Sequence, residues 1–115
     1  MRIPTFPNVR VVGMHFRGPH AKAWAEACQP GDEIFYEREP ENQYDPSAIK
    51  ILYNFQHMGY VERGQAAFIA PHIDDGVEFS CIVSGTQQEK LNIVPLVTFR
   101  PVEKTEELVE VHVEA

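Results

Sequence analysis

The chain of 115 residues is poor in the features that usually mark a metal site, a disulfide framework or a membrane segment. Its two cysteines, Cys28 and Cys81, lie far apart without a Cys-x-x-Cys motif, and its five histidines show no metal-ligand spacing. The longest apolar runs are a few residues, far short of the roughly 18 to 20 residues of a membrane span. We therefore expect two buried thiols rather than a disulfide, no metal site and no membrane partner.

Motifs for catalysis and for nucleotide cofactors are also missing. The seven glycines form neither a Gly-x-Gly-x-x-Gly pattern nor a phosphate-binding loop, and no serine or cysteine has a nucleophile motif around it. We interpret the alternating Glu37, Glu39 and Glu41 as a solvated strand face, and residues 74–76 as a turn. The sequence thus predicts no enzyme and no cofactor, and it disfavours a hydrolase or nuclease.

Basic residues are scarce. Ten Lys and Arg against 17 Asp and Glu give a net charge of -7, and non-specific binding to nucleic acid depends on many cationic contacts to phosphate. Residues 103–115 hold five of the Glu and one Lys, so the rest of the chain carries only -3. The net charge therefore argues against bulk electrostatic attachment to nucleic acid, although the body of the chain is only mildly acidic.

Hydrophobic patterns predict a mainly β chain with two short helices, of the α+β class. The predicted strands cover residues 9–16, 34–36 and beyond, 48–53, 57–61, 77–84 and 91–99, and the predicted helices cover 19–28 and 65–70. Trp24 is the expected core anchor of the first helix, and Pro95 demotes the last strand toward an edge or a bulge. Six short strands in one domain, residues 1–102, favour a small β-barrel or a strongly curved sheet. The acidic segment 103–115 is either a late edge strand or a solvated extension.

The segment from Arg38 to Ile49 carries far more polar chemistry than a plain turn needs. Asn42, Asp45 and two prolines are turn formers, so geometry accounts for them. It does not account for Tyr44 directly before Asp45. This pair is the best candidate site in the sequence.

Other aromatic residues with polar neighbours lie at the ends of predicted strands. His15 and Phe16 lie beside Arg17 at the end of the first strand, and Tyr60 lies close to Arg63 at the end of the fourth. Rings beside Arg and Asn are typical of single-stranded nucleic-acid sites, because any base can stack on a ring while Arg contacts phosphate. Taken alone, Phe16 and Tyr60 favour packing in the core. Only Arg17, Arg38 and Arg63 supply cations near the candidate site.

Three motifs together resemble the HIRAN domain family, over residues 9 to 100. They are Val-Val-Gly-Met-His-Phe around Gly13, the run from Arg38 to Ile51, and Met58-Gly59-Tyr60-Val61 followed by a helix. The resemblance implies an OB-like six-stranded small β-barrel that captures the 3′ end of single-stranded DNA. In eukaryotic members this module belongs to a fork-remodelling ATPase, which links the family to DNA repair and the replication fork.

The resemblance also implies roles for individual residues. Tyr44 and Phe16 would stack on terminal bases, and Asn42 would hold the loop or touch the terminal nucleotide. Tyr60 and Arg63 would meet the DNA backbone. His15 stands where eukaryotic members have Arg, which weakens a phosphate contact near neutral pH because an ordinary His is mostly uncharged there.

Asp45 would accept a hydrogen bond from the free 3′-hydroxyl. A carboxylate repels a 3′-phosphate and meets no donor where the strand continues through a phosphodiester, so such a residue selects ends.

The resemblance leaves an alternative open, namely a protein-interaction module of the same fold that has lost DNA binding. In that case the acidic face or the Val and Glu alternation of residues 108–113 would recruit a partner by strand addition. A DNA-processing protein is a further candidate partner. Residues 1–7 have no apolar stretch typical of a secretory signal, so we expect an intracellular, cytoplasmic protein of bacterial or phage type, either free-standing or a fragment.

Overall fold

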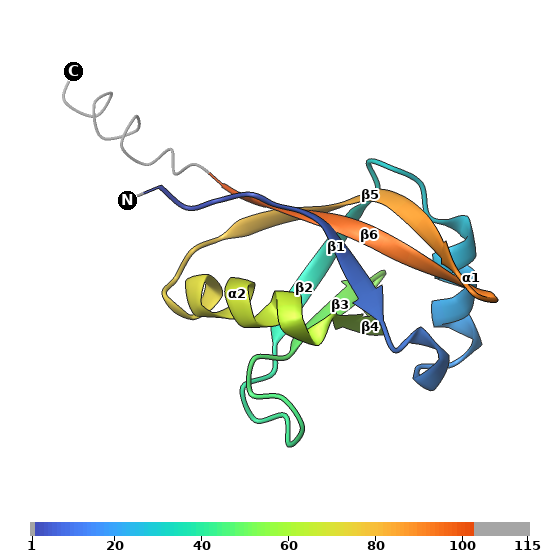
Figure 1. Cartoon of the computed structure of the whole chain (residues 1–115), viewed down its shortest axis with the longest axis horizontal. Helices are drawn as coiled ribbons and strands as arrows, with labels where there is room; N and C mark the ends of the chain where they lie inside the picture. Colours follow the sequence, from blue (N-terminus) through green and yellow to red (C-terminus); the bar gives the residue numbers. More distant parts are fainter. Residues whose placement is uncertain (1, 103–115) are drawn as a thin grey trace.

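A computed structural model describes residues 2–102, which form a closed barrel of six strands with two α-helices and one short 3-10 helix (Figure 1). In chain order the elements are β1 (Phe6–Val12), η1 (Met14–Phe16), α1 (Pro19–Ala27), β2 (Glu33–Arg38), β3 (Ile49–Tyr53), β4 (Gln56–Val61), α2 (Arg63–Asp74), β5 (Phe79–Glu89) and β6 (Asn92–Pro101). The strands close in the order β1-β4-β3-β2-β5-β6, and all neighbours are antiparallel. The predicted mainly β, OB-like barrel is confirmed. Both predictions for residues 103–115 lie outside the described residues.

The barrel interior is filled by side chains at alternating strand positions, such as Ile49 and Ile51 of β3 or Val97 and Phe99 of β6. This follows from the two-residue period of a strand, which sends every second side chain to the same face. Trp24 of α1 joins this core and is only 6% exposed, as predicted. The two cysteines are also buried and form no disulfide, which confirms the prediction of two buried thiols.

The first strand is shorter at its C-terminal end than predicted. Gly13 has φ +80, in the left-handed region that favours glycine, and it ends β1 at Val12. Residues 14–16 then form η1 instead of strand, and Phe16 is 73% exposed. The prediction of a strand to residue 16 is therefore wrong, as is the reading of Phe16 as a core residue.

The second helix is longer than the predicted 65–70. It begins after Glu62, whose side chain accepts a hydrogen bond from the Gln65 amide, and it runs through Pro71 to Asp74. Proline lacks an N–H and removes one bond from the helix. The helix continues nevertheless, because Ala66 and Ile69 on its inner face are fully buried against the barrel.

The position of Pro95 agrees with the edge prediction. β6 pairs with β5 along its length, but its pairing with β1 reaches only to Leu96. Pro95 therefore lies in the part of β6 that has one strand neighbour, where its missing N–H costs no ladder bond to β1. This end of the β5 and β6 hairpin extends beside α1 (Figure 1).

A glycine makes the seam between β1 and β4 possible. A Cβ atom on Gly59 would lie 2.6 Å from the backbone oxygen of Val12, which cannot move out of the way easily. The close approach allows Val12 to pair with Tyr60. The pairing of Val12 with Tyr60 thereby brings the end of β1, and η1 after it, beside β4.

Candidate nucleic-acid interface

The loop between β2 and β3, residues 39–48, projects from the barrel (Figure 1). Asn42 Oδ1 accepts hydrogen bonds from the amides of Tyr44 at 2.8 Å and Asp45 at 3.0 Å, and Asp45 Oδ1 accepts one from the Ser47 amide at 2.9 Å. Such side-chain bonds to nearby amides replace the missing ladder and fix a turn. The loop therefore presents Tyr44 in a defined position, where it is 83% exposed.

Arg38 braces the base of this loop. Its Nε and Nη2 donate to the two carboxylate oxygens of Asp74 at 2.9 and 3.0 Å, and its Nη1 and Nη2 donate to the carbonyls of Ala48 and Pro46 at 2.8 and 2.9 Å. The two bonds to the carboxylate, and the charge of Arg38, hold the pKa of Asp74 below its ordinary value. Arg38 thus joins β2, the loop and the end of α2, and it is not one of the cations available to a ligand.

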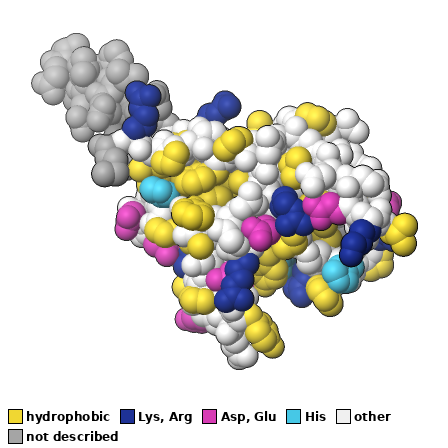
Figure 2. Space-filling view, viewed as in Figure 1, with side chains coloured by type: hydrophobic (Ala, Val, Ile, Leu, Met, Phe, Trp, Pro, Cys, Tyr) yellow, Lys and Arg dark blue, Asp and Glu magenta, His cyan; other side chains and the backbone are white. Residues whose placement is uncertain are grey.

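A cavity of about 370 Å³ lies between the loop and the barrel, within the ~300–1,000 Å³ range of ligand pockets. Six of the eight predicted site residues line it, from four separate parts of the chain. They are Arg17, Asn42, Tyr44, Asp45, Tyr60 and Arg63, with Val12, Ala48 and Val61 as the apolar wall. In space-filling view the loop forms a lobe at the lower edge, where hydrophobic and acidic side chains gather close to Lys and Arg (Figure 2).

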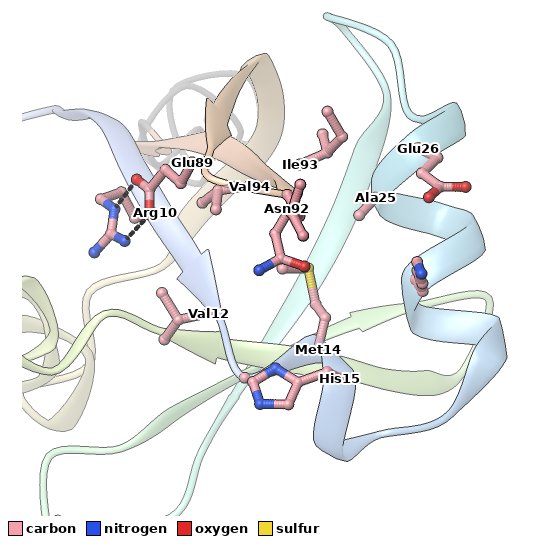
Figure 3. A pocket seen from close by; sticks show the side chains of 13 residues that line it. Arg10, Val12, Met14, His15, Ala25, Glu26, Glu89, Asn92, Ile93 and Val94 are labelled. Atoms are coloured by element: carbon pink, nitrogen blue, oxygen red, sulfur yellow. Dashed lines mark hydrogen bonds and ion pairs between the residues drawn. The ribbon is translucent and has the colours of Figure 1, made fainter.

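His15 and Phe16, the other two predicted residues, lie outside this lining. They belong to η1, and their ring centroids lie 3.9 Å apart with the ring planes tilted by 40°. His15 instead lines a second groove of about 240 Å³ between the end of β1, α1 and the β5 and β6 hairpin. Figure 3 shows His15 at one side of that groove and the Arg10 and Glu89 ion pair at the other. The DNA contacts assigned to His15 and Phe16 stay predictions.

Glu39 is an important residue that the sequence reading missed. Its Oε1 accepts hydrogen bonds from Asn42 Nδ2 at 2.9 Å and from the Tyr60 hydroxyl at 2.8 Å, and its Oε2 is 3.6 Å from Lys50 Nζ. These partners, Asn42 first, hold the pKa of Glu39 below its ordinary value. The interpretation of this residue as part of a solvated strand face is wrong. Only the pattern of alternating Glu drew attention to it, and that pattern does not reveal its partners.

The bond to Glu39 also defines what Tyr60 can offer a ligand. A hydroxyl has one proton to donate, and that of Tyr60 is directed at Glu39. Burial, followed by this bond, raises the pKa of Tyr60 above its ordinary value. Tyr60 therefore offers its ring and an acceptor oxygen to the cavity, rather than a donor for phosphate.

Arg17 lies over the same ring, with its Cζ 6.0 Å from the centroid of Tyr60. Its Nη1 is 3.2 Å from Nδ1 of His57, a second residue that the sequence reading missed. In the described part of the chain, neither Arg17 nor Arg63 takes part in an ion pair. These two arginines are thus the cations of the cavity that can meet an anion.

The carboxylate of Asp45 has one oxygen available. Oδ1 is occupied by the Ser47 amide, whereas Oδ2 accepts no hydrogen bond from any residue between 2 and 102. Asp45 is half-buried, so a ligand in the cavity can reach it from one side. Its open oxygen can accept a hydrogen bond from a hydroxyl or amine.

The motifs of the loop and of β4 fit a known family over almost all of the described chain. The family model of the HIRAN domain matches residues 6–101. The chain belongs to the HIRAN domain family. HIRAN domains are DNA-binding modules, so the expectation of a binding module is confirmed at the level of the family.

Solved structures confirm the HIRAN fold. The crystal structure of the HIRAN domain of human HLTF is similar with a TM-score of 0.63 and 21% identity, over 91% of this chain and 82% of that one. The crystal structure of a protein from Lactobacillus plantarum is similar with a TM-score of 0.66 and 25% identity, over 84% of this chain and 95% of that one.

A curated relative is the Fanconi-associated nuclease 1 homolog of Oryza sativa subsp. japonica, which is 37% identical over 73 residues, or 59% of this HIRAN chain. The matched part is only 8% of that relative's length. Among residues 2–102 of this HIRAN domain, no three His, Cys, Asp or Glu side chains are grouped to hold a metal ion. No helix in the same range has the length and apolar character needed to cross a membrane.

Proposed function

We propose that this HIRAN domain binds single-stranded DNA at a free 3′-hydroxyl end, in the cavity between the loop 39–48 and the barrel. One observation carries the proposal, namely the convergence of three kinds of group in a single cavity. These are the exposed ring of Tyr44, the open oxygen of Asp45, and two arginines that form no ion pair within residues 2–102.

Stacking supplies the affinity. Tyr44 stands on a loop that is already ordered by Asn42 and Arg38, so a base can stack on its ring without a further cost of ordering the loop. Such stacking contributes roughly 1 to 3 kcal/mol per base. Phe16 offers a second exposed ring on η1 for a neighbouring base.

Charge supplies the selection of the end. The Oδ2 atom of Asp45 accepts a hydrogen bond from the terminal 3′-hydroxyl, whereas it repels a 3′-phosphate. Glu39 does not line the cavity, and its charge is offset by Lys50, but its carboxylate holds both Asn42 and Tyr60 in place. Asn42 braces the loop between the two carboxylates, with bonds to Glu39 and to the Asp45 amide.

Arg17 and Arg63 bind the phosphates that precede the terminal nucleotide. The ring of Tyr60 then lies between the DNA strand and the barrel wall. Two phosphate contacts on a single strand give a slope of about -1.4 for the logarithm of the binding constant against the logarithm of salt concentration. This shallow slope is compatible with a protein of net charge -7. It would be steeper if binding were mainly electrostatic.

The test is fluorescence anisotropy with oligothymidylates labelled at the 5′ end and ending in either a 3′-hydroxyl or a 3′-phosphate. We expect the hydroxyl end to bind at least about tenfold more tightly, which is the effect of one charge-assisted hydrogen bond. Equal binding to both ends overturns the proposal. Binding to neither end also overturns it and favours the protein-interaction alternative.

Asp45→Asn makes the test specific. It keeps the size and an acceptor oxygen but removes the charge, so the discrimination against phosphate should shrink more than the affinity for hydroxyl. The matched control is Glu41→Gln, which neutralises an exposed carboxylate of the same loop outside the cavity lining. We expect this control to leave the discrimination unchanged.

A further inference from the structure

The geometry points to His57 as a positioning residue, which holds Arg17 over the ring of Tyr60 so that its guanidinium meets the phosphate next to the captured nucleotide. This inference rests on the proposed function, since it names how one of its phosphate contacts is prepared. Arg17 itself is exposed and follows η1 in a turn. His57 is half-buried at the start of β4, so its ring is held by the barrel and can hold the exposed side chain of Arg17 in place.

The hydrogen bonds of His57 define a single protonation state. Arginine can only donate, so Nδ1 of His57 must be the acceptor for Arg17 at 3.2 Å. The carbonyl of Gly59 can only accept, so Nε2, at 3.0 Å from it, must carry the ring proton. Both nitrogens are satisfied only in the neutral form with the proton on Nε2. The bond to the Gly59 backbone thereby fixes the ring that holds Arg17.

Aromatic contacts complete the support. The rings of His57 and Tyr60 meet edge to face, with centroids 4.7 Å apart and planes at 85°. Tyr60 is in turn held by its hydroxyl bond to Glu39. Arg17 donates one Nη1 proton to His57, so four of its five N–H donors remain for a phosphate.

Protonation of His57 would release Arg17, because Nδ1 would then carry a proton and two cations would stand side by side. The groups that face His57 are Arg17 from the turn after η1, Lys50 from β3, Glu39 from the start of the loop 39–48 and Tyr60 from β4. His20 of α1 also bonds to the His57 carbonyl, at 3.1 Å.

The balance of these groups sets the direction of the pH effect. Burial, and then the positive charge of Arg17, lowers the pKa of His57 below its ordinary 6.5, while Glu39 opposes the shift. Since the binding form contains neutral His57, affinity should be constant above this lowered pKa and fall as the pH drops through it.

Two substitutions separate the roles of the ring and of its acceptor. His57→Phe keeps the ring and its contact with Tyr60 but removes the acceptor. His57→Asn places an acceptor oxygen near the former Nδ1 and cannot become charged. We expect His57→Phe to weaken binding of a 3′-hydroxyl oligothymidylate by roughly 2- to 10-fold, the effect of leaving one long side chain to be ordered on binding. His57→Asn should restore most of that loss.

The pH profile tests the same point. Affinity of the wild type should be constant above about pH 6.5 and fall as the pH drops further, whereas that of His57→Asn should change much less over the same range. Equal profiles for the two proteins contradict the inference. A general effect of acid on the DNA site would appear in both and cancel in the comparison.

A double substitution tests whether His57 acts through Arg17. Arg17→Met removes the guanidinium and keeps a long apolar side chain. If His57 only positions Arg17, His57→Phe causes no further loss of affinity in the Arg17→Met background. An additive loss would assign His57 a direct or general structural role and overturn the inference.

A measurement without DNA keeps this inference distinct from the proposed function. Nitrogen NMR of the His57 ring should show the neutral form with the proton on Nε2, and Arg17→Met should raise the His57 pKa toward its ordinary value. A proton on Nδ1, or an unchanged pKa, contradicts the positioning role even if oligonucleotide ends are discriminated. The expected NMR result without end discrimination would instead refute the proposed function.

Discussion

Two turns of this HIRAN domain present an aromatic side chain to solvent, and one of the two lines the candidate site. Tyr44 in the loop 39–48 is 83% exposed, and Phe55 in the turn between β3 and β4 is 99% exposed. Tyr44 shares a cavity with Asp45 and the two arginines, whereas Phe55 does not line that cavity. Exposure of a ring alone therefore does not distinguish the two turns, whereas the convergence of polar partners marks the loop 39–48 as the candidate site.

The backbones of the two turns differ as well. The side-chain oxygens of Asn42 and Asp45 accept hydrogen bonds from backbone amides and hold the first turn, and Tyr44 needs no left-handed backbone conformation there. The second turn has two residues, Asn54 and Phe55, with φ of 55 and 66, the left-handed pair of a type I′ turn. Glycine is preferred at the second of these positions, and nothing in the structure explains a Phe there. Side-chain hydrogen bonds thus order the turn that carries Tyr44, whereas Phe55 occupies a backbone conformation that disfavours its side chain.

The largest expected effect compares the two rings directly. Tyr44→Ala should weaken binding of 3′-hydroxyl single-stranded DNA by about 5- to 150-fold, the equivalent of one lost stacking contact. Phe55→Ala should leave the affinity unchanged. Anisotropy titrations of both variants at the same salt concentration provide the measurement, and equal losses would break the distinction between the two turns.

The brace of the loop should have the next largest effect. Arg38→Met removes four hydrogen bonds from a charged donor and should lower the free energy of unfolding by about 2 kcal/mol, as judged from urea denaturation. Most of this loss should come from the bonds to Pro46 and Ala48, since Asp74 is half-exposed and screened by solvent. Arg100→Met, at an exposed position of β6, is the control and should change stability by less than about 0.5 kcal/mol.

Removal of the inner loop bonds should have a smaller effect. Asn42→Ala leaves the amides of Tyr44 and Asp45 without their acceptor and should cost about 1 kcal/mol in unfolding free energy. Gln43→Ala alters the exposed neighbour and should be close to neutral. Hydrogen exchange of the Tyr44 and Asp45 amides should accelerate only in Asn42→Ala. Unchanged exchange would mean that the loop is held mainly by Arg38.

Acid should weaken the same region. Because the folded protein lowers the pKa of Glu39 below its ordinary 4.5, this carboxylate stabilises the fold above that value, and the contribution is lost as the pH falls through the lower, folded pKa. Glu39→Gln should be less stable than the wild type near neutral pH and approach it in acid. Unfolding midpoints measured from about pH 6 to pH 3 test this, and a gap that stays constant would contradict it.

The smallest effect should come from the second turn. Phe55→Gly relieves a side chain held at positive φ and should raise the free energy of unfolding by about 0.5 to 1 kcal/mol, after the entropy cost of glycine is subtracted. Thermal or urea unfolding gives the answer. A loss of stability would show that the ring of Phe55 contributes contacts that outweigh its backbone strain.

Local patterns in the sequence predicted most of the fold. Alternating apolar residues such as Ile49 and Ile51 identified strands, and the turn formers Asn42 and Asp45 identified the loop. The predictions failed where a single residue or distant packing decided the outcome. Gly13 ended β1 earlier than its apolar run suggested, and burial of Ile69 and its neighbours carried α2 through Pro71.

The sequence by itself determined the family, the barrel class and the loop that carries Tyr44 and Asp45, because these depend on patterns within a few neighbouring residues. Only the tertiary structure decided which charged groups are engaged and which remain available. Arg38 meets Asp74 across 36 positions, Arg17 meets His57 across 40, and Tyr60 meets Glu39 across 21. Closure of the barrel creates these contacts, and no local periodicity encodes them, which is why two similar arginines became a structural brace and a candidate phosphate ligand.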